Sequence, residues 1–298
     1  MQMRMRFWMP LLLVFLITAV PSGVIAGPLQ VVATTPSMGA IARIVGGDEV
    51  EVHVLAAPDR DAHSLYARPS MLARLRRADM VVAVGAQLEE GWLPAALDGA
   101  ANPRLRVGQP GHFAAADALH LRPTRFDPSL GGHVHGEGNP HFNLSPPRMG
   151  DVAMAFAERL ALLLPDAAKS FRSRAEDFAS AITERVPILA ARLDPPLRLI
   201  AYHEEFDYFS EWLPVEVMDF IEPKPGVPPS PRHLSHLVES HQGSTGQIVY
   251  AVFQPHAAPK RLADALQWPV HALSLEPAEA DAEGYFALLE HWVATLAR

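Results

Sequence analysis

The most constraining feature of the sequence is one long helical tract in the middle of the chain. Between Asp166 and Leu193 apolar residues recur at intervals of three and four, which predicts a single amphipathic helix. Pro195 and Pro196 end it, because proline lacks the backbone donor that an interior helical position needs. At about 1.5 Å per residue this helix spans on the order of 40 Å. It is therefore long enough to join two lobes rigidly.

On both sides of the tract, short apolar β-branched runs alternate with helical patterns. This order is typical of parallel sheets covered by helices. The sequence therefore predicts an α/β fold with two similar lobes with parallel sheets, joined by one long rigid helix. The expected segments are a signal peptide (1–26), an N-terminal lobe (27–164), the linking helix (165–194) and a C-terminal lobe (195–298). The expected strands are Leu29–Thr35, Val50–Ala56, Asp79–Gly85, Leu197–Tyr202, Val215–Ile221, Gln247–Phe253 and Val270–Leu275.

The N-terminus has the pattern of a secretory leader. Two arginines precede the apolar run 7–20, and the small residues Val24 and Ala26 stand at the −3 and −1 positions before Gly27. The run is short for a membrane anchor. We therefore expect Met1–Ala26 to be removed and the mature chain to act outside the cytoplasm. The chain has no cysteine, so neither a disulfide nor a lipid anchor on cysteine is expected.

The charge balance bears on the class of ligand. With 33 acidic and 25 basic residues the chain has a formal net charge of −8, and loss of Arg4 and Arg6 with the leader makes it more acidic. Nucleic acid is therefore excluded as a partner, because phosphate backbones require a basic surface. The acidic charge balance favours a cation as the ligand.

Several polar residues follow the expected strands, where ligands of open α/β sheets bind. His63 lies in the loop after the second strand, and His203 and Gln254 directly follow strands of the C-terminal lobe. His141 precedes the helical region. Two candidates from each lobe can meet in one interlobe cleft. Of the 14 histidines, the following are interpreted as ordinary surface or core residues: His53, His112, His120, His236, His271 and His291.

The segments around these residues resemble those of one protein family. "DAHSLYARPS" resembles a DPHxYxxxPSD segment, "NPHFNLSP" a DPHxWLDP segment and "AYHEEFDYFSEWL" an xHxAFxYFxxxYGL segment. "IEPKPGVPPSPRHLSHL" and "QPHAAPKRLADAL" stand where the family carries its EPxPGxPPS-like and last ligand segments. The family is that of the periplasmic metal-binding proteins that supply zinc or manganese to ABC importers, in its zinc-uptake branch. The resemblance covers essentially the whole mature chain, in order.

The resemblance implies a monomeric receptor, not an enzyme, that captures Zn²⁺ between its lobes and delivers it to an ABC import permease. It identifies His63, His141 and His203 with the three imidazole ligands of the family. Imidazole is a good zinc donor at about 2.0–2.1 Å, and three of them leave one tetrahedral position open.

The fourth position is where the chain departs from the family. Gln254 stands where the family usually carries Glu or Asp, and His256 follows two residues later. The candidates are His256, a water or hydroxide, the Gln254 oxygen, and the carboxylates of Glu204 or Glu222. We favour water or His256, and we expect Gln254→Glu to strengthen binding. Three histidines without an obvious acid favour zinc over manganese.

Two further segments have open interpretations. His133 and His135 lie in a stretch with four glycines, where zinc importers of this family often carry a His- and acid-rich loop. This loop either binds metal weakly or is a solvated loop, and in both cases the central site is expected not to need it. "EPKPGVPPSP" is interpreted as a rigid connection in preference to a metal contact through Glu222.

The competing functions are a zinc-dependent hydrolytic or hydrating enzyme, a manganese or other divalent-metal receptor, a periplasmic zinc chaperone and an adhesion module. A three-histidine zinc site can activate water. The sequence, however, contains no HExxH-like motif that would place a general base. The absence of a lipid anchor counts against an adhesin.

Overall fold

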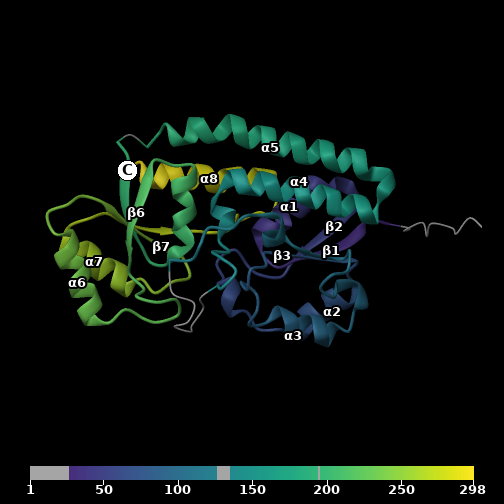
Figure 1. Cartoon of the computed structure of the whole chain (residues 1–298), viewed down its shortest axis with the longest axis horizontal. Coiled ribbons are helices and arrows are strands. Elements are labelled where there is room, and N and C mark those ends of the chain that lie inside the picture. The colour runs from purple at the N-terminus through teal and green to yellow at the C-terminus, as the bar shows by residue number, and fades with distance from the viewer. Residues whose placement is uncertain (1–26, 126–134, 194) are drawn as a thin grey trace, which may run out of the picture.

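The computed structural model describes residues 27–125, 135–193 and 195–298. It has two lobes side by side, each built on a four-stranded parallel sheet with helices around it (Figure 1). The predicted α/β class with two similar lobes is thus confirmed. The expected leader, 1–26, and His133 lie outside the described residues.

The N-terminal lobe contains the three expected strands and one that was not expected. The short strand β4 pairs only with β3, at the edge of the sheet, and is too brief to show a periodic pattern in the sequence. Apolar clusters cover both faces of the sheet. In spatial order the strands are β2 (Val50–Val54), β1 (Leu29–Ala33), β3 (Met80–Ala83) and β4 (His112–Ala114), and the helices are α1 (Pro36–Gly46), α2 (Pro69–Arg77) and α3 (Leu93–Ala100).

The C-terminal lobe repeats this plan. All four expected strands are present, and Ser230 and Pro231 begin a helix as an N-cap and first-turn pair, with the Ser230 hydroxyl accepting from the backbone N–H of His233. The strands in spatial order are β6 (Val215–Phe220), β5 (Leu197–Ala201), β7 (Gln247–Ala251) and β8 (Val270–Leu273), and the helices are the 3-10 helix η8 (Glu204–Glu211), α6 (Pro231–His241), α7 (Ala257–Leu266) and α8 (Ala282–Leu296).

The predicted long helix is α5 (Ala168–Ala190), which packs against α4 (Pro146–Leu163) and extends along both lobes (Figure 1). It begins two residues later and ends three residues earlier than the apolar pattern indicates, and it continues through Pro187. Its apolar stripe, including Phe171 and Phe178, is buried as expected.

The two lobes also share one continuous apolar core. A single cluster of buried side chains includes residues of β1 and α1 in one lobe, of α4 and α5, and of β5 and α8 in the other lobe. The lobes are therefore held together by packing as well as by α5. No helix in the described ranges has both the length and the apolar character to cross a bilayer.

Candidate functional site

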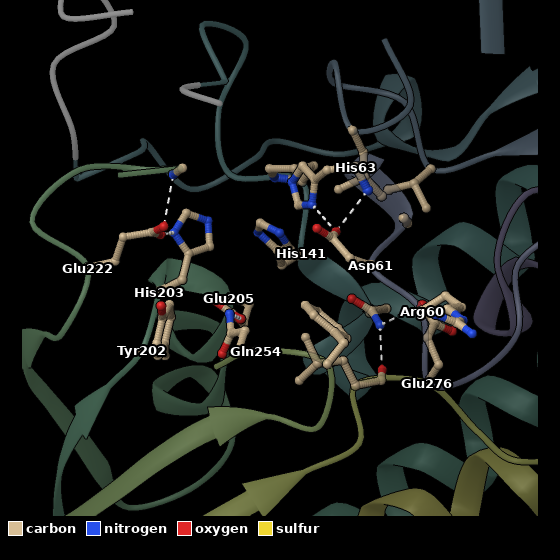
Figure 2. A pocket seen from close by; sticks show the side chains of 18 of the residues that line it. Arg60, Asp61, His63, His141, Tyr202, His203, Glu205, Glu222, Gln254 and Glu276 are labelled. Atoms are coloured by element: carbon tan, nitrogen blue, oxygen red, sulfur yellow. Dashed lines mark hydrogen bonds and ion pairs between the residues drawn. The ribbon is translucent and has the colours of Figure 1, made fainter. Parts of the chain in front are cut away.

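Loops that follow the strands of both sheets enclose one cavity between the lobes. Its volume is about 300 Å³. Figure 2 shows side chains of the N-terminal lobe, such as Asp61 and His63, facing His203 and Glu222 of the C-terminal lobe, with His141 between them. The polar residues that line the cavity include Asp61, His63, His141, Asn143, His203, Glu205, Glu222, Gln254 and Glu276.

Three imidazoles form the tightest group in the cavity region. One ring nitrogen each of His63, His135 and His141 lies within 4.8 Å of the other two. The Nε2 atoms of His63 and His135 are 3.0 Å apart. Two nitrogens bound tetrahedrally to one zinc ion at ~2.0–2.1 Å would be about 3.3 Å apart. These nitrogens are thus already close to the spacing that a shared metal ion requires.

His203 lies beside this group on the C-terminal lobe. Its ring centroid is 5.4 Å from that of His141 and 6.4 Å from that of His63, and it meets both rings edge-on. The structure therefore brings together the three histidines that the sequence singled out and adds His135 to them.

A similar turn holds His63 and His141. The Asp61 Oδ1 atom accepts from the backbone N–H of His63 and lies 2.8 Å from its Nδ1, and the Asn139 Oδ1 atom makes the same two contacts with His141 at 3.0 and 2.7 Å. The Asn139 amide nitrogen donates to the Glu204 carbonyl, so its oxygen faces His141. An oxygen acceptor at Nδ1 places the ring proton there and leaves the Nε2 lone pair for a metal.

His203 is oriented differently. The Glu222 Oε2 atom lies 2.9 Å from the His203 Nδ1 atom, and the other Glu222 oxygen accepts from the backbone N–H of Gly226. Glu222 thus connects the Pro- and Gly-rich loop to His203. The Asx residue two positions before each of His63 and His141 is visible in "DAH" and "NPH", whereas the Glu222 partner is not predictable from local sequence.

The charges around the rings set their protonation. Burial, together with His63, His203 and His135 nearby, holds the pKa of His141 well below its usual 6.5. Burial also lowers the pKa of His203, but the carboxylates of Glu205, Glu222 and Glu204 outweigh it and raise that pKa to about 9.

Asp61 is held in its charged form. Burial raises the pKa of the Asp61 carboxyl, but its hydrogen bonds with His63 and Ser64 and the charge of His63 outweigh burial and lower that pKa to about 2. Asp61 therefore remains an acceptor for the His63 ring at neutral pH.

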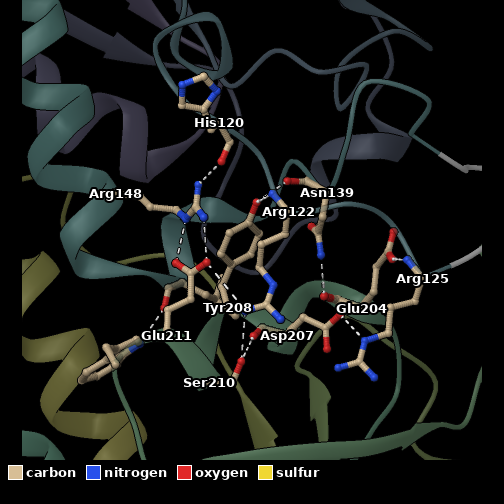
Figure 3. A network of polar contacts seen from close by, with 12 residues as sticks. His120, Arg122, Arg125, Asn139, Arg148, Glu204, Asp207, Tyr208, Ser210 and Glu211 are labelled. Atoms are coloured by element: carbon tan, nitrogen blue, oxygen red, sulfur yellow. Dashed lines mark hydrogen bonds and ion pairs between the residues drawn. The ribbon is translucent and has the colours of Figure 1, made fainter.

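An interlobe network anchors the loop that carries His135 and His141 (Figure 3). The Tyr208 hydroxyl donates to the Asn139 carbonyl, and the Tyr208 oxygen accepts from the backbone N–H of Arg122. The Glu204 carboxylate accepts from the Thr124 hydroxyl and from the Arg125 N–H. Both ends of the loop are thereby attached to η8, the helix that begins directly after His203.

The candidates for the fourth position lie in different environments. His256 is exposed, precedes α7 and is not among the residues that line the cavity. Both ends of the Gln254 amide are engaged, since its oxygen accepts from the Ala251 N–H at 2.7 Å and its nitrogen donates to Glu205 Oε1 at 2.6 Å. Glu204 and Glu222 are engaged in the contacts described above.

Sequence reasoning left His135 outside the central site, but it is only 2% exposed and contacts His63. A glycine-rich loop has no periodicity that would indicate where its side chains point. The one available signal is that His135 lies six residues before His141 and on the same loop.

Comparisons with known proteins point to one family. Residues 31–298 match the family model described as ZnuA, zinc-uptake complex component A, periplasmic. The high-affinity zinc uptake system protein ZnuA of Yersinia pestis is 22% identical over 225 residues, which is 70% of each chain.

Solved structures have the same fold. A crystal structure of ZnuA has a TM-score of 0.73 at 21% identity and covers 91% of this chain and 100% of that one. The Pseudomonas aeruginosa protein FpvC in complex with Mn²⁺ has a TM-score of 0.73 at 19% identity, covering 91% of this chain and 97% of that one. The laminin-binding protein Lmb of Streptococcus agalactiae, described as a bifunctional protein with adhesin and metal-transporting activity, has a TM-score of 0.72 at 20% identity, covering 90% of this chain and 98% of that one.

Proposed function

Because this chain belongs to the ZnuA family of periplasmic zinc-uptake components, we propose that it captures Zn²⁺ in the interlobe cavity and delivers it to an ABC import permease. It is a periplasmic metal-binding receptor, and proteins of this family are transport receptors that work with ABC importers, not enzymes. What the family alone leaves open is which metal this cavity selects and which side chains hold it.

We propose His63, His141, His203 and His135 as the ligands. The observation that carries this set is the group of three ring nitrogens within 4.8 Å, beside which His203 lies on the facing lobe. Further support comes from the oxygen acceptors at the Nδ1 atoms of His63, His141 and His203. Such acceptors raise the basicity of a ligand imidazole and fix its orientation.

The donor set supports zinc as the metal. Imidazole suits zinc, copper and nickel, whereas manganese prefers carboxylate, carbonyl and water oxygens. Four imidazoles satisfy the tetrahedral geometry that zinc adopts. Structures of the same fold hold Mn²⁺ and Ni²⁺, so the proposed preference for zinc rests on this chain's own side chains and not on its fold.

The test is direct. Protein purified without added metal is analysed by elemental mass spectrometry and then titrated with zinc against a chelator of known affinity, with manganese and nickel as competitors. We expect one zinc ion per chain and a preference for zinc over manganese. A preference for manganese would contradict the proposed metal, and absence of stoichiometric binding would contradict the proposed site.

Zinc affinity should depend on pH because of His203. With a pKa of about 9, this ring is protonated at neutral pH in the metal-free protein, and zinc must displace the proton. We therefore expect affinity to rise about tenfold per pH unit between pH 7 and 8 and to level off above about pH 9. His141, whose pKa is lowered, adds no such dependence above pH 7. Chelator competition at pH 7, 8 and 9, corrected for protonation of the chelator, measures this. Equal affinities at the three pH values would rule out the protonated state of His203.

We also propose that Met1–Ala26 is a cleaved leader. The arginines and the apolar run that precede Ala26 support export, and the mature chain would begin at Gly27. The intact mass of protein recovered from the periplasm of an expressing bacterium tests this position.

A further inference from the structure

One carboxylate oxygen in the cavity wall is buried without a hydrogen-bond partner. Glu205 is 1% exposed and lines the cavity, next to His203 and Gln254 (Figure 2). Its Oε1 atom accepts from the Gln254 amide, and its Oε2 atom has no hydrogen-bond partner in the part of the chain that the structure describes. Leaving a buried charged acceptor unpaired costs more than leaving a neutral one unpaired. This atom therefore requires an explanation.

The other acids that line the cavity do not share this feature. Asp61 accepts from His63 and Ser64, and Glu222 contacts His203 and Gly226. Glu276 accepts from both the backbone N–H and the hydroxyl of Ser37 through Oε2, and its Oε1 atom is 3.4 Å from the Asn143 amide. Among the acids that line the cavity, Glu205 alone has a carboxylate oxygen that is buried without a hydrogen-bond partner in the described residues.

The hydrogen bonds of Gln254 determine which end of its amide group faces Glu205. Because the Gln254 oxygen accepts from the Ala251 N–H, its amide nitrogen must point to Glu205 and donate. A donor at this position requires an acceptor oxygen on Glu205, and the second oxygen of Glu205 has no partner among the described residues. Gln254, which stands where the family usually carries Glu or Asp, thus orients the carboxylate of Glu205.

We infer that Glu205 is the carboxylate of the metal site, with its Oε2 atom facing the bound cation and compensating part of its charge, and that Gln254 is its positioning residue. This inference rests on the proposed function and names a residue beyond the four imidazoles. Neutral imidazoles leave both charges of a divalent ion uncompensated, and a carboxylate in the cavity wall reduces that cost. Because an oxygen donor also suits manganese, Glu205 narrows the preference for zinc over manganese.

The test compares Glu205→Gln with a matched control, Glu276→Gln. Both substitutions remove a carboxylate from the same cavity with little change of shape, but the Glu276 oxygens are already engaged by protein donors. We expect Glu205→Gln to weaken zinc binding about 10-fold to 100-fold, as loss of an outer partner of a metal site typically does, and to weaken manganese binding more. We expect Glu276→Gln to weaken zinc binding less than Glu205→Gln does, because Ser37 and Asn143 already hold the Glu276 oxygens. The measurements are chelator competition for zinc and metal competition for the zinc-to-manganese ratio.

Gln254→Met gives an independent test, because it removes the donor to Glu205 and retains the side-chain length. We expect a smaller loss of zinc affinity than for Glu205→Gln. We also expect the double variant to lose less than the sum of the two single effects, as contacting residues do in a double-mutant cycle. If Glu205→Gln does not fold, the loss of zinc affinity in Gln254→Met tests the inference in its place.

Three results would overturn the inference. They are parental affinity in Glu205→Gln, an equal loss in Glu276→Gln, and strictly additive effects of the Glu205 and Gln254 substitutions. Failure of the proposed function is distinguishable, because the parent protein itself would then not bind zinc with one-to-one stoichiometry.

Discussion

Replacing His141 with alanine should weaken zinc binding by about 100-fold to 1,000-fold. Structural zinc sites with four donors contribute about 10–16 kcal/mol, so one donor accounts for about 2.5–4 kcal/mol, and 1.4 kcal/mol corresponds to a factor of ten. His141 is 7% exposed and Asn139 holds its Nδ1 atom, so the turn fixes the orientation of the ring and of its Nε2 atom. Chelator competition with purified His141→Ala measures the effect, and we expect losses of similar size for His63→Ala and His203→Ala.

The control for these variants is His236→Ala, which removes an exposed histidine on α6, a helix that lies away from the cavity. It should bind zinc like the parent. Thermal unfolding without metal separates loss of the site from loss of the fold, because only the zinc-dependent rise in the melting temperature should disappear in the ligand variants. Parental affinity in any one of them would remove that residue from the site.

The sequence was sufficient to predict most of the fold. Seven of the eight strands in the described part of the chain follow from apolar runs, and α5 follows from its repeated spacing, because burial of one face imposes those patterns directly. The pattern failed at β4, whose three residues are too few to show a period. It also placed the ends of α5 too far out, because a 3-10 helix, Pro165–Ala167, precedes α5, and Leu193, the last residue of the apolar spacing, lies beyond its end.

The candidate site was only partly predictable. His63 and His203 follow strands of different lobes, and the carboxyl ends of parallel strands are where polar side chains meet. The position of His135, in contrast, depends on contacts such as that of Tyr208 with Asn139, 69 residues away in the chain. No local pattern encodes a contact of that separation.

Gln254 also shows that local sequence does not reveal contacts between residues far apart in the chain. On the sequence alone, Gln254→Glu supplies a missing acid and strengthens binding. In the structure the new carboxylate would lie against Glu205 Oε1, which is now 2.6 Å from the Gln254 amide nitrogen. Two carboxylates at that distance cannot both be ionised without a large cost. The gain is therefore no longer expected.

The fourth imidazole gives the second large effect. Replacing His135 with alanine should lower zinc affinity on the same scale as His141→Ala, because its Nε2 atom is 3.0 Å from that of His63 and its side chain is buried beside the rings of His63 and His141. His256→Ala, the alternative that the sequence favoured, should leave affinity unchanged, since His256 is exposed and does not line the cavity. Chelator competition with the two single variants makes the comparison.

Cobalt substitution distinguishes a lost ligand from a general weakening. Tetrahedral Co²⁺ has intense visible bands that respond to the donor set, so His135→Ala should change the spectrum as water or another oxygen replaces a nitrogen, while His256→Ala should keep the parental spectrum. The opposite pattern would return the fourth position to His256. If neither variant changes affinity or spectrum, three histidines and a solvent ligand hold the metal, and the 3.0 Å contact between His63 and His135 belongs to the metal-free state alone. If His135→Ala changes both, the short glycine-rich loop is part of the binding site itself, and attaching its two ends to η8 positions a ligand as well as joining the lobes.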